Sequence, residues 1–134
     1  MKGHARQLMT PNDVVVSPET TLAEAARELA RVEISGLPVS DDQGRVIGIV
    51  TESDLLGALL GTSPNNTAVQ ALMTPHIVTV DEFTPADYVV QLLREHKIHH
   101  LPVIRQGVVV GLITPQSVIQ YFVTHELPSP PEAA

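Results

Sequence analysis

The chain has no cysteine and no tryptophan, and its aromatic residues are two tyrosines and two phenylalanines. The absence of cysteine excludes disulfides, thiolate metal sites and a cysteine nucleophile. Basic residues are also few, since eight Lys and Arg stand against fifteen Asp and Glu, a net charge of −7. A nucleic-acid partner needs basic side chains for its phosphates or aromatic platforms for its bases, so we expect none.

Long apolar runs are absent as well. No stretch approaches the roughly 18 apolar residues that suggest a membrane span, and the N-terminal MKGHARQLMTP has no apolar leader core. We therefore expect a cytoplasmic protein with no membrane partner. At 134 residues the chain is long enough for one compact domain, whose core must be built mostly from Val, Leu, Ile and Ala.

What the chain does contain is an internal repeat. Three short motifs occur twice in the same order, the first two at an offset of 64 residues and the third at 63. They are QLMTP at 7–11 and ALMTP at 71–75, LPV at 37–39 and 101–103, and GIVT at 48–51 with GLIT at 111–114. The second copy is one residue shorter in a predicted turn, where DDQG at 41–44 corresponds to RQG at 105–107.

Each copy predicts the same elements: a short strand, a helix, a two-stranded hairpin and a closing helix. In the first copy these are residues 14–16, a helix from Thr20 or Thr21, strands 37–40 and 46–51, and a helix over 53–60; in the second they are residues 77–80, a helix from Thr84, strands 101–104 and 108–114, and a helix from 115 to about 124. Residues 7–60 and 71–124 are therefore predicted as two repeats. A linker with a short lead-in helix (61–70) joins them, and a disordered Pro-rich tail (125–134) follows.

Thr51 and Asp54 stand where the second hairpin strand of the first copy runs into a helix. A Thr and an Asp at this spacing can cap the helix by reciprocal hydrogen bonds. The carboxylate could instead accept both hydroxyls of a vicinal diol, such as that of a ribose. The four-residue pattern alone favours the cap, and the repeat strengthens the second interpretation.

Over about residues 7–124 the chain resembles a tandem pair of cystathionine-β-synthase (CBS) domains, also called a Bateman module. The resemblance rests on the repeated Met-Thr-Pro, the apolar-Pro-Val strand and Gly-Ile-Val-Thr-x-x-Asp. The resemblance implies an α/β (α+β) fold of two β-α-β-β-α repeats related by pseudo-two-fold symmetry in one compact module. It implies a regulatory module, not an enzyme, that binds an adenosine-containing ligand between the repeats and signals to an effector protein the sequence does not name. AMP, ADP, ATP, S-adenosylmethionine and NAD belong to this ligand class. The alternative is a dimeric interaction module whose clefts bind nothing.

Carried over residue by residue, the resemblance implies two unequal clefts, with no catalytic residue and no resident cofactor. One cleft contains Thr51, Asp54, Val78, His99 and His100, and the other contains Val14, Ser35, Gly36, Thr114 and Ser117. Ser117 stands where the family has Asp, and Ser35 and Gly36 supply no cation. We therefore expect the Asp54 cleft to be the working site and the other to be weak or empty.

His99 and His100 are the basic pair next to a predicted strand, so phosphate binding there should tighten as pH falls from about 8 to 6. A metal site is the weaker interpretation of these residues and His96. No carboxylate or cysteine lies beside them at ligand spacing, and a strand would point His99 and His100 to opposite faces.

Two further expectations concern packing. The closing helices carry LLxALL at 55–60 and VIxYFV at 118–123, which are apolar on more than one stripe. We expect a homodimer through these helices, and a monomer at micromolar concentration would contradict it. Gly48 and Gly111 could allow either close approach of a ligand or close packing within the protein.

Overall fold

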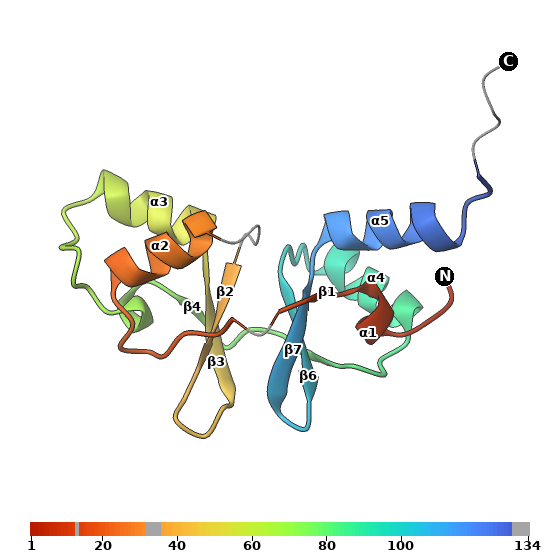
Figure 1. The fold of residues 1–134 in the computed structure, drawn as a ribbon, viewed down its shortest axis with the longest axis horizontal. Coiled ribbons are helices and arrows are strands. Elements are labelled where there is room, and N and C mark those ends of the chain that lie inside the picture. Colours follow the sequence, from red (N-terminus) through yellow and green to blue (C-terminus); the bar gives the residue numbers. More distant parts are fainter. Residues whose placement is uncertain (13, 32–35, 130–134) are drawn as a thin grey trace, which may run out of the picture.

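A computed structural model describes residues 1–12, 14–31 and 36–129, and shows two similar halves side by side (Figure 1). The first half contains α2 (Leu22–Arg31), β2 (Gly36–Ser40), β3 (Val46–Thr51) and α3 (Glu52–Leu60), and the second contains α4 (Ala86–Glu95), β6 (Leu101–Arg105), β7 (Val108–Ile113) and α5 (Pro115–His125). Helices and sheets are mixed in each half, which confirms the α+β fold and its two repeats. No helix in the described part of the chain is long and apolar enough to cross a membrane.

Each repeat is organised around one antiparallel hairpin. In the first, Leu37 faces Val50 across β2 and β3, and in the second, Leu101 faces Ile113 across β6 and β7. All four side chains are fully buried. The hairpins point to the same side of the molecule, and α2, α3, α4 and α5 lie towards the opposite side (Figure 1).

The Met-Thr-Pro motifs are exchanged between the two sheets. The N-terminal one forms β1 (Thr10–Pro11), which pairs with β7 of the second repeat. The other forms β4 (Thr74–Pro75), which pairs with β3 of the first. Proline suits such a place, because it can lie at a sheet edge where its missing N–H is not needed. Each repeat thus completes the sheet of the other.

The cores are exchanged in the same way. The short α1 (Ala5–Leu8) places Ala5 and Leu8 in the core of the second repeat. The 3-10 turn η1 (Val69–Ala71) places Val69 in the core of the first. These three side chains are almost completely buried, so they join the repeats into one module by apolar burial.

Gly48 and Gly111 are explained by this exchange. A Cβ on Gly48 would lie 2.6 Å from Met73 Sδ and 2.8 Å from the Thr74 carbonyl oxygen. A Cβ on Gly111 would overlap the side chain of Met9. Of the two expectations for these glycines, close packing is therefore the observed one, and its partner is the exchanged methionine.

The first strand of each repeat is shorter than expected. Residues 14–16 form a single parallel bridge between Val16 and Val39. Of the expected strand over residues 77–80, Val80 alone lies in a strand, the short β5 (Val80–Asp81). Asn12 Oδ1 accepts the Val14 N–H at 2.8 Å, so a local turn takes the donor that a longer strand would need. At the other end of the chain, α5 reaches His125, and residues 130–134 of the expected tail lie outside the described residues.

Candidate ligand clefts

Thr51 and Asp54 form a complete capping box at the start of α3. Thr51 Oγ1 accepts the Asp54 N–H at 3.2 Å. Asp54 Oδ2 accepts the Thr51 N–H at 2.8 Å and the Thr51 hydroxyl at 3.0 Å. The other carboxylate oxygen, Oδ1, receives no hydrogen bond within residues 1–12, 14–31 and 36–129. Capping and diol binding are therefore compatible, because each can use a different oxygen.

The imidazole of His100 interacts electrostatically with the carboxylate of Asp54. The pKa of His100 is lowered mainly because the imidazole is half-buried, and next because His99 adds positive charge. Glu52 and Asp54, at the start of α3, act in the opposite direction and favour the imidazolium. The structure thus brings His100 of the second repeat close enough to Asp54 of the first for the two charges to interact.

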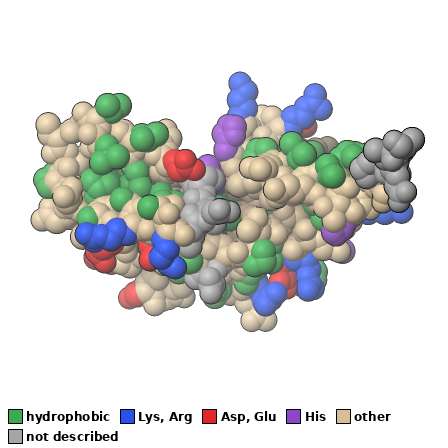
Figure 2. All heavy atoms as spheres, turned by 45° about the horizontal axis from the view of Figure 1, so that its top comes forward, with side chains coloured by type: hydrophobic (Ala, Val, Ile, Leu, Met, Phe, Trp, Pro, Cys, Tyr) green, Lys and Arg blue, Asp and Glu red, His purple; other side chains and the backbone are tan. Residues whose placement is uncertain are grey.

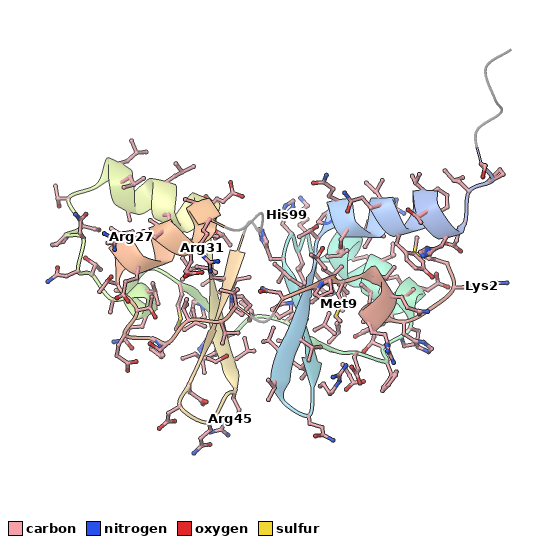
Figure 3. The ribbon with its side chains drawn as sticks, in the orientation of Figure 1. Lys2, Met9, Arg27, Arg31, Arg45 and His99 are labelled. Carbon is pink, nitrogen blue, oxygen red and sulfur yellow. The ribbon has the colours of Figure 1, made fainter. Side chains whose placement is uncertain are left out.

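His100 also contacts Gly36, which the sequence prediction placed in the other cleft. A Cβ on Gly36 would lie 3.1 Å from His100 Cδ2. The two residues occupy equivalent positions in the repeats, so this contact lies where the two predicted clefts meet. His99 is exposed at the boundary between the halves (Figure 3). Val78 is 45% exposed between β4 and β5, and Ser35 lies outside the described residues.

In the second predicted cleft, a serine stands where the first has the carboxylate of Asp54. Ser117 is buried, and its Oγ accepts the Thr114 N–H at 3.0 Å and donates to the Thr114 carbonyl oxygen at 3.0 Å. Thr114 Oγ1 in turn accepts the Ser117 N–H at 3.1 Å. The Ser117 hydroxyl thus both accepts and donates within the cap of α5, and the weak ribose contact expected there stays a prediction.

Val14 opens instead onto a groove that the sequence prediction missed. This groove has a volume of about 500 Å³ and lies between residues 14–17 and the exposed side of α2, and neither Thr114 nor Ser117 lines it. Its helical wall carries Glu24, Arg27, Glu28 and Arg31. A signal was present in the sequence, because arginines four residues apart lie on one face of a helix.

Metal ligands do not converge in the described part of the chain. No group of three or more His, Asp or Glu side chains there could hold a metal ion. His96 follows the end of α4, whereas His99 and His100 lie just before β6. Of these residues, His100 is the one whose pKa responds to the charges of Glu52 and Asp54.

Comparison with known proteins gives two matches to one family model. The model of the CBS domain matches residues 5–61 and 69–124. Inosine-5′-monophosphate dehydrogenase of Aquifex aeolicus is 32% identical over 114 residues, which are 84% of this chain and 23% of the dehydrogenase. The chain thus spans about a quarter of the length of that relative, and the rest of the dehydrogenase lies outside the match.

Solved structures agree with the family match. CBSX2, solved in complex with AMP, has a TM-score of 0.78 and 30% identity, with 91% of this chain and 97% of that chain covered. The CBS domain pair of MJ0100, solved with 5-methylthioadenosine and S-adenosyl-L-methionine, has a TM-score of 0.81 and 24% identity, with 94% and 100% covered. The second likeness supports the fold only.

Proposed function

Because this chain belongs to the CBS domain family and is a tandem pair of its domains, we propose that it is a regulatory module that senses an adenosine-containing nucleotide. The ligand binds at the Asp54 cleft, between the repeats, and its occupancy is passed to a partner protein. The pair is a regulatory module and carries no catalytic role in this proposal. The cytoplasmic location expected from the sequence stays a prediction.

The observation that carries the proposal is the environment of Asp54. Its Oδ2 is used by the cap, while Oδ1 receives no hydrogen bond from the residues that the structure describes, and the charge of Asp54 acts on the half-buried imidazole of His100. A ribose diol can donate to that oxygen, and the two histidines can face the phosphate, with Val78 next to the adenine. Thr51 fixes the rotamer of the carboxylate and so orients it for the ligand. The likeness to CBSX2, which was solved with AMP, supports the same ligand class.

Calorimetry with AMP, ADP, ATP, S-adenosylmethionine and NAD tests the proposal. At least one of them should bind the wild type, and Asp54→Ala should weaken it by about 10- to 100-fold, as expected for loss of one or two charge-assisted hydrogen bonds. Thr21→Ala is a matched control, because Thr21 Oγ1 accepts the Glu24 N–H at 3.1 Å in an equivalent box at α2. It should lower stability and leave the affinity of the Asp54 cleft unchanged.

If none of the five ligands binds, the box at α3 is only a cap. The chain is then the alternative, an interaction module with unoccupied clefts, and the search should turn to protein partners.

The same proposal includes a homodimer through the closing helices. Large side chains on α3 and α5 are exposed to solvent, among them Leu59 at 68%, Leu60 at 92% and Ile119 at 61%. Figure 2 shows hydrophobic side chains gathered over both halves on the side turned forward. An apolar surface that extends over two helices of a single chain is typical of an interface, and a second copy offers the same two helices in return.

A further inference from the structure

A groove of about 480 Å³ lies between the two repeats, next to the turn of the first hairpin. This inter-hairpin groove is lined by residues 15–17, by residues 40–42 and Gly44 of the first hairpin, and by Val108 and Val109 of the second. Ser40 lies four residues beyond Gly36 along β2, about 13 Å at the usual rise of a strand. None of the residues predicted for the two ligand clefts lines the groove, so it is a separate place on the molecule.

The charge at this hairpin is reversed relative to the second repeat. In the second repeat, Arg105 Nε lies 2.7 Å from Glu82 Oε2, and the Glu82 side chain is only 8% exposed. The positions 64 residues earlier are Asp41 and Pro18. The first repeat thus has a carboxylate where the second has a guanidinium, and a proline where the second has the partner of that guanidinium. The cation that Arg105 supplies to the second repeat has no counterpart at this position of the first.

The hydroxyl of Ser40 is buried without a partner. The residue is 7% exposed, and its Oγ has no hydrogen-bond partner in the part of the chain that the structure describes. Leu37 and Val39 pack in the core of the first repeat, and side chains alternate along a strand, so Ser40 points to the other face of β2, towards the groove. The equivalent residue of the second repeat is the apolar Ile104. A buried hydroxyl without a partner costs free energy, and a ligand in the groove can supply the missing hydrogen bond.

Asp41 and Asp42 give the groove its negative charge. Asp41 Oδ1 accepts the N–H groups of Arg45 and Gln43, each at 2.9 Å, and these hydrogen bonds, that of Arg45 first, lower the pKa of the carboxyl. Arg45 Nε also lies 3.3 Å from Asp41 Oδ2, but the arginine side chain is 68% exposed, and an exposed ion pair of this kind contributes little. Asp42 is exposed and makes no hydrogen bond or ion pair with any residue that the structure describes. Both carboxylates are therefore available to an incoming cation.

We propose that the inter-hairpin groove binds an aliphatic amine, whose ammonium group lies against Asp41, Asp42 and Ser40 Oγ and whose alkyl chain lies on the valines. Val15 and Val108 are 42% and 54% exposed, so the alkyl chain removes apolar surface of both repeats from water. This site goes beyond nucleotide sensing and does not rest on it, because it uses none of the residues of the Asp54 cleft.

The walls of the groove set the class of ligand. Two carboxylates line it and no basic residue does, which argues against an anion. No group of three or more metal ligands lies within residues 1–12, 14–31 and 36–129, and a bare metal ion would leave the valines uncovered. An amine satisfies both kinds of wall, because its ammonium group donates to the carboxylates and its alkyl chain covers the apolar surface.

Calorimetry of the full chain with pentylamine tests the site. One equivalent per chain should bind at millimolar concentration, and 1-pentanol, which has the same alkyl chain and no charge, should bind at least about tenfold more weakly. Asp42→Asn should weaken pentylamine about tenfold and leave the melting temperature unchanged, because the side chain bonds to no described residue. Ser40→Ala should also weaken pentylamine, while the melting temperature stays equal or rises, because a buried hydroxyl without a partner is removed.

Glu95→Gln is the matched control, because Glu95 is an exposed carboxylate at the end of α4, outside the groove. It removes the same charge from the protein and should leave pentylamine binding unchanged. The site would be overturned if pentylamine did not bind, if 1-pentanol bound equally well, or if Asp42→Asn and Glu95→Gln weakened binding equally. AMP binding at the Asp54 cleft should persist in all three variants, so the two proposals are tested separately.

Discussion

At the scale of single residues, the pairs Thr51–Asp54 and Thr114–Ser117 show how one capping geometry leads to two different chemical capacities. Both boxes share the two reciprocal hydrogen bonds between the N-cap residue and the third residue of the helix. A carboxylate that caps with one oxygen keeps a second acceptor, whereas a hydroxyl that both accepts and donates has little left to offer. This difference is the physical reason for expecting unequal clefts, and the inequality itself stays a prediction.

His100 provides a prediction for pH. Burial lowers the pKa of its imidazole in the folded protein below the ordinary value near 6.5, so the folded state holds fewer protons than the unfolded state in that window. The free energy of unfolding should therefore decrease as pH falls from about 7 to 5. Urea unfolding at several pH values measures this, and His100→Gln should flatten the dependence. If the free energy of unfolding depended equally on pH in the wild type and in His100→Gln, His100 would not be the group responsible.

A bound phosphate should raise the pKa of His100, which burial lowers in the free protein. The phosphate adds negative charge next to an imidazole that Glu52 and Asp54 already bias towards the charged form. NMR titration of the His100 ring should show a pKa below about 6.5 in the free protein and a higher pKa with AMP present. AMP binding should accordingly tighten as pH falls, while adenosine, which has no phosphate, should show no such change. An unchanged His100 titration with AMP would remove this imidazole from the site.

At the scale of elements, the exchanged edge strands explain why two strands contain glycine. Gly48→Ala should destabilise the protein by about 1 to 3 kcal/mol, because the new Cβ would meet the backbone oxygen of Thr74 at 2.8 Å as well as Met73. Gly111→Ala should also destabilise the protein, because its Cβ would overlap the side chain of Met9. Thermal or urea unfolding measures both effects.

Gly57 is the matched control for these substitutions. It lies inside α3, and nothing lies within 4 Å of a Cβ placed on it. Gly57→Ala should stabilise the protein by roughly 0.5 to 1 kcal/mol, because alanine favours the helix. If all three substitutions had the same effect, the methionine contacts would not be the reason for Gly48 and Gly111.

The elements that the sequence predicted well are those whose signal is local. Hairpin strands and closing helices appear within one or two residues of their predicted bounds, because β-branched runs, turn residues and helical periodicity lie within each segment. The exchange of β1 and β4 was not predicted, because Met-Thr-Pro says where a strand starts but not which sheet it joins. The groove along α2 was missed for a similar reason, since charges on a helix do not reveal what faces them.

At the scale of the whole molecule, the exposed apolar sides of α3 and α5 predict a dimer that can be separated without unfolding the chain. Leu59→Glu with Phe122→Glu should convert the dimer to a monomer, because charges would be buried in the interface. Stability of the monomer should change little, since the side chains are 68% and 40% exposed. Sedimentation at several concentrations measures the change.

Tyr88→Glu is the control for the dimer, because Tyr88 is also a large exposed side chain, at 52%, but lies on α4. It should leave the dimer intact. A wild type that sediments as a monomer at micromolar concentration would contradict the interface altogether.

The most direct test of the central claim, that Asp54 binds the ribose of a nucleotide, is a cycle of two proteins and two ligands. AMP and 2′-deoxy-AMP are titrated into the wild-type chain and into Asp54→Asn. The missing hydroxyl should weaken binding about tenfold or more when Asp54 is present and hardly at all when Asp54 is replaced. An equal loss in both proteins would contradict the claim and leave Asp54 as the cap of α3 alone.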